Sequence, residues 1–207
     1  MLAGACTVSD CQREVDAAYQ QRDRSGYRSE TTTVLTSRWT RRMTVEFAPP
    51  DRTRILLLDG GVVGSEVPLI EIGKRFWYRM DGRWLGQRSA FVADLFAFSR
   101  APPDERTFVC LGPVEFAGKT YAGYRAPYSP KHAMRALVVY SLATREDAQE
   151  IESEPREQPP LWRTVLLDRD TGLPAYEIVA PENKLEQPTS RRQYSYPPDI
   201  TIEPPLQ

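Results

Sequence analysis

The expected fold rests on one stretch of sequence, residues 39–47, which reads Trp39-Thr40-Arg41-Arg42-Met43-Thr44-Val45-Glu46-Phe47. Its odd-numbered positions are mostly apolar, and its even-numbered positions are polar. Because successive side chains of a β-strand point to opposite faces, this period of two predicts a strand with one buried face and one solvated face. A sheet of such strands needs a cover on its apolar face.

Short segments of this kind recur along the chain at hairpin spacing. Turn residues separate them, as at Asp59-Gly60-Gly61, where glycine permits the positive backbone angles of a tight turn. The expected strands are residues 27–36, 39–47, 52–58, 68–72, 75–80, 107–116, 120–126, 134–142, 162–168 and 173–179. A last extended segment is expected at residues 193–202. The sequence therefore predicts a sheet of about ten strands.

Two segments predict helices. Ser9 followed by Gln12 forms a capping-box pattern, and apolar residues recur at helical spacing from Cys11 to about residue 22. The segment Ala90 to Phe98 is almost continuously apolar and is expected to cover the apolar face of a curved sheet. Strands that outnumber two helices predict an α+β protein.

Composition restricts the function classes. The chain of 207 residues carries 27 Lys and Arg against 28 Asp and Glu. Because these charges nearly cancel, no global field attracts nucleic acid. No window of 18 apolar residues, the length needed for a membrane-spanning helix, is present in the sequence. Residues 9–204 are expected to form one domain, preceded by residues 1–8 as a residual signal or flexible N-terminus.

The first residues resemble the end of a bacterial lipoprotein signal. Small residues, including Ala3, precede Cys6, which would be lipidated after cleavage. The charged and apolar regions of such a signal do not precede this run, so a chance run of small residues stays an alternative. A lipidated Cys6 predicts export. Export also permits a disulfide between Cys6 and Cys11, which would leave Cys110 as a buried free thiol in a strand.

The sequence offers little for catalysis or metal binding. His132 is the single histidine, and the three cysteines lack the spacing of metal ligands. No nucleophile elbow, phosphate-binding loop or dinucleotide fingerprint is present in the sequence, since Gly60-Gly61 and Gly64 fall in an expected hairpin. We therefore expect no enzyme activity, no metal and no cofactor, although a hydrolase stays an alternative that a screen of ester substrates would test.

Four local phrases, taken with the order of the elements over residues 9–204, point to a known family. They are Pro50-Asp51-Arg52, the run from Glu71 to Tyr78 followed by Trp84, the run from Leu167 to Pro174, and Tyr194-Ser195-Tyr196 with Ile200 to Pro204. In these features the chain resembles the LolA-like superfamily of bacterial periplasmic lipoprotein carriers and lipid-binding lipoproteins. The resemblance implies a strongly curved antiparallel half-barrel with helices covering its concave face.

The resemblance also implies a function: non-catalytic binding of a lipid, an acyl chain or a lipidated protein in the concavity. Burying an acyl chain yields about 0.8 kcal/mol per methylene group, so binding needs apolar area more than directed hydrogen bonds. The residues that we expect to supply this area are Trp39, Met43, Phe47, Phe76, Tyr78, Met80, Phe91, Leu95 and Phe98. As an alternative, each of these side chains belongs to an ordinary hydrophobic core.

The expected location is the periplasm or outer cell envelope, with membrane association through lipidation of Cys6. The sequence leaves open whether the protein carries, accepts or senses its ligand. A second hypothesis is an envelope sensory or protein-interaction domain on the same scaffold, without lipid cargo. Arg41 is expected on the same face as Met43, where it would meet a lipid headgroup or pair with a carboxylate such as Glu30.

Overall fold

The computed structural model describes residues 8–34, 40–59, 66–80, 82–87, 96–97, 99–105, 107–128, 159–182 and 184–205. Its first element is the helix α1 (Val8–Ser25). The strands are β1 (Tyr27–Val34), β2 (Thr40–Ala48), β3 (Arg52–Asp59), β4 (Glu66–Ile72), β5 (Arg75–Met80), β6 (Arg83–Gln87), β7 (Val109–Phe116), β8 (Lys119–Pro127), β9 (Leu161–Asp168), β10 (Pro174–Pro181) and β11 (Ser190–Ser195).

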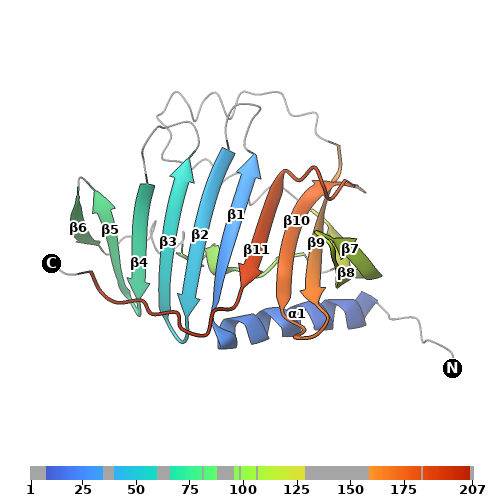
Figure 1. Cartoon of the computed structure of the whole chain (residues 1–207), viewed down its shortest axis with the longest axis horizontal. Helices are drawn as coiled ribbons and strands as arrows, with labels where there is room; N and C mark the ends of the chain where they lie inside the picture. The colour runs from blue at the N-terminus through green and yellow to red at the C-terminus, as the bar shows by residue number, and fades with distance from the viewer. Residues whose placement is uncertain are drawn as a thin grey trace.

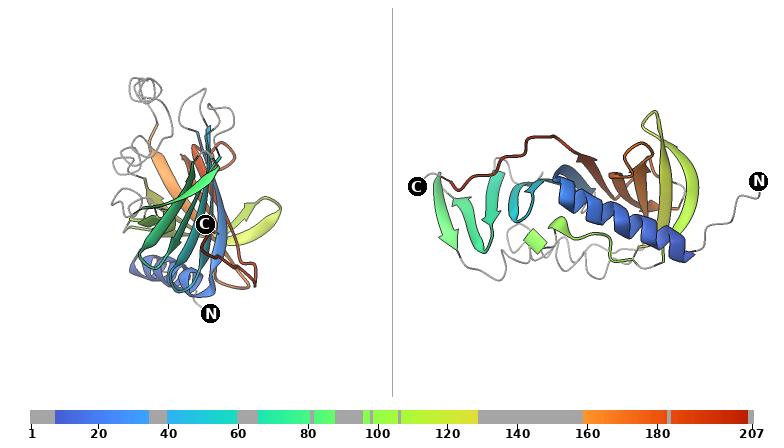
Figure 2. Two further views of the ribbon diagram at one scale, coloured as in Figure 1. Left: turned by 90° about the vertical axis from the view of Figure 1, so that its left-hand side faces the viewer. Right: turned by 90° about the horizontal axis from the view of Figure 1, so that it is seen from below.

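All eleven strands belong to one sheet, in the order β6-β5-β4-β3-β2-β1-β11-β10-β9-β8-β7 (Figure 1). Every neighbouring pair is antiparallel, and the edge strands β6 and β7 stand at opposite ends of the sheet. Figure 2 shows that the sheet is curved and does not close. The expected α+β class and curved antiparallel sheet are confirmed, with eleven strands in place of about ten.

Two strand predictions need correction. The sequence analysis did not predict β6, because the segment around Trp84 and Leu85 is too short to show a period of two. The last strand begins at Ser190 and ends at Ser195, so residues 196–202 do not continue the strand. The predicted strand 134–142 and the loop with His132 lie outside the described residues. So does most of the predicted helix 90–98, except Phe96 and Ala97.

The described cover of the sheet is α1, which lies across the lower ends of β1, β11, β10 and β9 (Figure 1). Its buried residues include Cys11, Val15 and Ala18, so the predicted helical spacing does define the packed stripe. The helix ends where Gly26 adopts a φ of 73°. A Cβ at Gly26 would stand 3.0 Å from the Phe47 carbonyl oxygen, which is closer than an ordinary van der Waals contact. Because glycine has no Cβ, β1 can start directly after the helix.

A disulfide joins the first turns of α1 to the edge of the sheet. It links Cys11 to Cys110 of β7, which is 99 residues away in the sequence. The predicted Cys6–Cys11 disulfide and the predicted free thiol at Cys110 are therefore wrong. Cys11 is 1% exposed, because the bond fits between the packed helix and the strand.

We call the face of the sheet that packs against α1 the inner face and the opposite one the outer face. The inner face forms the main core, whose buried side chains come from α1, from seven of the strands and from Phe96 and Phe108. A smaller cluster lies on the outer face around Ile178 and Leu166. The alternation read from residues 39–47 is confirmed for Met43, Val45 and Phe47, all of which point to the inner face.

Candidate functional site

An apolar region runs across the inner face from β2 to β6, and the buried polar residues Arg41, Thr53 and Glu71 lie on the same face. Met43, Phe47, Ile55, Leu57 and Leu69 are its buried members. Phe76 and Tyr78 of β5 are half-buried and pack against them. The register places these side chains in rows across the strands, since Met43 stands opposite Leu57 and Leu69 stands opposite Tyr78.

The structure brings together four of the nine predicted ligand-binding residues. Met43, Phe47, Phe76 and Tyr78 share the apolar region. Met80 belongs to β5 and alternates onto the same face, and its side chain is not described. Trp39, Phe91, Leu95 and Phe98 lie outside the described residues. The binding role of all nine residues stays a prediction.

Phe96 covers part of the apolar region. Its ring is fully buried and stacks on that of Phe76, with 5.6 Å between the ring centroids. Ser99 donates a hydrogen bond to the Phe96 carbonyl oxygen at 2.9 Å, which holds this short turn in place. The contact places one residue of the predicted covering segment, residues 90–98, on the inner face.

The apolar region reaches an exposed edge of the sheet. Leu85 of β6 stands opposite Tyr78, so it shares the inner face, and it is 36% exposed. Among the described strands, β6 pairs only with β5. Apolar side chains therefore run from the buried core to a partly exposed edge strand.

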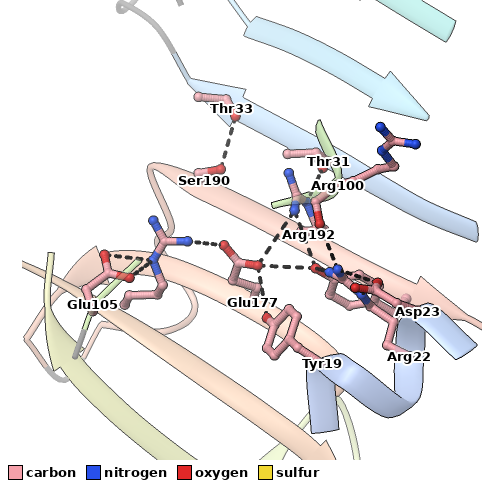
Figure 3. Close-up of polar contacts among 12 residues, drawn as sticks. Tyr19, Arg22, Asp23, Thr31, Thr33, Arg100, Glu105, Glu177, Ser190 and Arg192 are labelled. Carbon is pink, nitrogen blue, oxygen red and sulfur yellow. Dashed lines mark hydrogen bonds and ion pairs between the residues drawn. The ribbon is translucent and has the colours of Figure 1, made fainter. Parts of the chain in front are cut away.

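A buried polar cluster lies beside the apolar region, on the inner face of β9, β10 and β11 (Figure 3). Glu177 is at its centre and forms an ion pair with Arg163, whose Nη1 donates to Oε1. Arg192 lies 3.8 Å from Glu177 Oε2. The hydroxyls of Tyr19 and Tyr194 donate to the same oxygen at 3.1 and 3.2 Å.

The electrostatics of this cluster favour fixed charges. Burial by itself would raise the pKa of Glu177, but Arg163 and Arg192 outweigh it, so the pKa lies below its ordinary value. Burial raises the pKa of Glu105 despite its ion pair with Arg163 at 2.9 Å. Burial also raises the pKa of Tyr19. At neutral pH the cluster therefore holds paired charges that anchor α1 to the sheet.

The last turn of α1 is held by a cation among aromatic rings. The guanidinium of Arg22 lies 4.6 Å from the ring centroids of both Tyr19 and Tyr27 and 5.7 Å from that of Tyr194. It also donates to the Arg100 carbonyl oxygen at 2.7 Å, and the residue is fully buried. Such contacts favour a desolvated cation, so Arg22 fixes the end of the helix.

Replacing Tyr27 by Phe should leave the free energy of unfolding unchanged or raise it by up to about 1 kcal/mol. The Tyr27 hydroxyl is buried and has no hydrogen-bond partner among the described residues, whereas its ring keeps the contact with Arg22 in either form. Burial raises the pKa of this hydroxyl to about 12. Urea unfolding of Tyr194→Phe serves as the control, because that hydroxyl donates to Glu177 and its loss should cost about 1.5–3 kcal/mol. A clear destabilisation by Tyr27→Phe would contradict this account.

Arg41 lies on the inner face, as predicted, and is 7% exposed. The predicted pairing with Glu30 is wrong, because Glu30 alternates to the outer face and accepts a hydrogen bond from Arg28 at 3.0 Å. In the register, Arg41 stands opposite Thr33, and Thr33 shares a hydrogen bond of 3.0 Å with Ser190.

A cavity of about 390 Å³ lies between α1 and the sheet. Glu14 and Ala18 line it from the helix, Tyr124 and Leu167 from β8 and β9, and Arg169 from the turn after β9. Its volume falls in the range of small-molecule sites. None of the described residues predicted to bind ligand lines this cavity, so it is separate from the apolar region.

In the described ranges, no three His, Cys, Asp or Glu side chains are grouped in a way that would hold a metal ion. The helices described here include none with the length and apolar character to cross a bilayer.

The sequence analysis missed the polar cluster. The sequence does contain a signal for this cluster. Glu177 is the one charged residue in the otherwise apolar run 173–180, and it alternates onto the inner face. Arg163 and Arg192 are likewise charged residues at inner positions of strands. A charge at an inward position predicts a buried partner, although the partner's identity depends on the strand order.

Comparisons with known proteins show the fold. A scan of protein-family models and a search of curated proteins find no match. Among solved structures, LprF from Mycobacterium bovis has a TM-score of 0.50 at 9% identity, with 99% of this chain and 100% of LprF covered. The Mycobacterium tuberculosis lipoprotein LppX has a TM-score of 0.47 at 10% identity, with 89% and 92% covered. The likeness to LprF confirms the predicted LolA-like fold.

A third similar structure is the complex of MucA and MucB from Pseudomonas aeruginosa, with a TM-score of 0.40 at 17% identity. The alignment covers 89% of this chain and 55% of the other, so this chain spans about half the length of that protein.

Proposed function

We propose that the chain, which has the LolA-like fold, is a non-catalytic protein of the bacterial cell envelope that binds a lipid, an acyl chain or a lipidated protein. The observation that carries this proposal is the apolar region, which continues from buried Met43 to partly exposed Leu85 at an edge of the sheet. A guest that covers such a surface gains about 25 cal/mol for each Å² of apolar area removed from water. The fixed charges of the polar cluster support binding rather than proton transfer.

The location proposed for the protein is the periplasm or the outer envelope. The disulfide between Cys11 and Cys110 supports an oxidising compartment, where such bonds form and persist. Lipidation of Cys6 stays a prediction, because residues 1–7 lie outside the described residues.

Leu85→Asp should lower ligand retention at least about tenfold, because it replaces apolar contact at the open edge by a carboxylate that resists desolvation. The protein would be purified without detergent from an oxidising periplasm, extracted with organic solvent and analysed for acyl chains by mass spectrometry. Leu111→Asp is the matched control: Leu111 is 38% exposed on the other edge strand, β7, and should keep the ligand.

Circular dichroism of both variants checks that the fold is retained. Wild-type protein without any acyl chain would overturn the proposal, and so would equal loss of ligand in the two variants. If wild-type protein does hold an acyl chain, transfer of that lipid to acceptor vesicles would test whether the protein acts as a carrier.

The alternative function, a sensory or protein-interaction domain, has one observation in its favour. Val109 and Leu111 of the edge strand β7 are both 38% exposed. An edge strand offers unpaired backbone groups, so a partner peptide can extend the sheet there. On this alternative, wild-type protein carries no lipid, and Leu111→Asp weakens partner binding while Leu85→Asp does not.

A further inference from the structure

The hairpin of β5 and β6 concentrates positive charge at one end of the sheet. Lys74, Arg75, Arg79 and Arg83 are all exposed, although the whole chain has a net charge of −1. None of these four cations forms an ion pair with another residue of the described chain. Arg79 donates a weak hydrogen bond of 3.4 Å to the Gly82 carbonyl oxygen.

Two tryptophans share this hairpin with the cations. Phe76 and Tyr78 point to the inner face, so Trp77 alternates to the outer face together with Arg75 and Arg79. Trp84 of β6 stands opposite Arg79 and therefore lies on the same outer face. Both tryptophans are partly exposed rather than buried.

An exposed surface that combines tryptophan and arginine matches the chemistry of a membrane interface. Tryptophan rings prefer the boundary between hydrocarbon and water. Exposed basic residues are attracted to anionic headgroups. Figure 1 shows β5 and β6 at one end of the sheet, away from the end where α1 begins.

We propose that the outer face of the β5–β6 hairpin, formed by Arg75, Trp77, Arg79 and Trp84, docks onto an anionic phospholipid surface. This contact is independent of the apolar region, because it uses the opposite face of the sheet. It also differs from the expected attachment through Cys6, since it needs no covalent lipid.

The test is co-sedimentation of the whole chain with vesicles. The protein would first be stripped of bound lipid, so that lipid at the inner face does not affect the measured binding. It would then be mixed with vesicles of phosphatidylglycerol and phosphatidylcholine or with vesicles of phosphatidylcholine alone. We expect binding to the anionic vesicles, with a loss near 1 M salt, where the screening length falls to about 3 Å. Arg75→Gln with Arg79→Gln should lower the partition constant about fivefold for each cation, or about 25-fold together.

The matched control is Arg28→Gln with Arg54→Gln, which removes the same charge from exposed arginines elsewhere on the outer face. This control should bind nearly as the wild type does. Trp84→Ser should weaken binding without a change of charge. Equal losses in the two arginine variants would overturn the proposal, as would no binding by the wild type. Tighter binding to polyglutamate that Trp84→Ser leaves unchanged would instead assign the surface to an acidic protein.

Discussion

Removal of the disulfide by Cys11→Ala with Cys110→Ala should lower the free energy of unfolding by about 4 kcal/mol. The bond closes a loop with a sequence separation of 99 residues. Its loss therefore raises the conformational entropy of the unfolded chain, which favours unfolding. It also frees the first turns of α1 from β7. For a chain of this size the melting temperature should fall by about 8–16 °C. Thermal and urea unfolding measure both quantities.

A thiol reductant provides the control for this prediction. Reduced wild-type protein should unfold like the double variant, whereas the double variant should not respond to the reductant. A difference below about 1 kcal/mol between oxidised wild type and the variant would show that the packing of α1, and not the cross-link, holds the helix.

Glu177→Gln should destabilise the protein by about 3–5 kcal/mol, because it removes the carboxylate that pairs with Arg192 and leaves Arg163 with Glu105 alone. Urea unfolding at neutral pH measures this loss. Glu182→Gln is a matched control, since Glu182 follows β10 directly and is 54% exposed beside Arg125. An exposed ion pair contributes about 0–1 kcal/mol, so this control should change stability little.

The contribution of Glu177 to stability should also depend on pH. The folded-state pKa of Glu177 lies below its ordinary value of 4.5, so its contribution to stability is present above that value. This contribution is lost as the pH falls from about 4.5 through the lower pKa of the folded state. The stability difference between the wild type and Glu177→Gln should therefore be largest at neutral pH and should shrink in acid. A difference that is constant from neutral pH to about pH 2 would contradict the role of Glu177.

The sequence predicted features that depend on local periodicity. The alternation of Met43, Val45 and Phe47 identified the inner face, and the spacing of Cys11 and Val15 identified the buried stripe of α1. These predictions succeeded because burial of one face imposes a period of two on a half-covered strand and a period of 3.6 on a half-covered helix.

Features that depend on distant pairing were missed. The partner of Cys11 is 99 residues away, and three cysteines allow several pairings that only the fold selects. Arg192 meets Glu177 because β11 lies between β1 and β10, an order that the local pattern does not contain. Arg41 and Glu30 lie on opposite faces, because the register pairs Arg41 with Thr33.

The two attachments of α1 restrict how this helix can move. The disulfide at Cys11 fastens the beginning of the helix, and Arg22, enclosed by tyrosine rings, fastens its end. A helix that is attached to the sheet at both of its ends cannot move away from the sheet as a lid would. On the proposed function, a guest would therefore reach the inner face from the opposite edge of the sheet, where Leu85 of β6 is partly exposed.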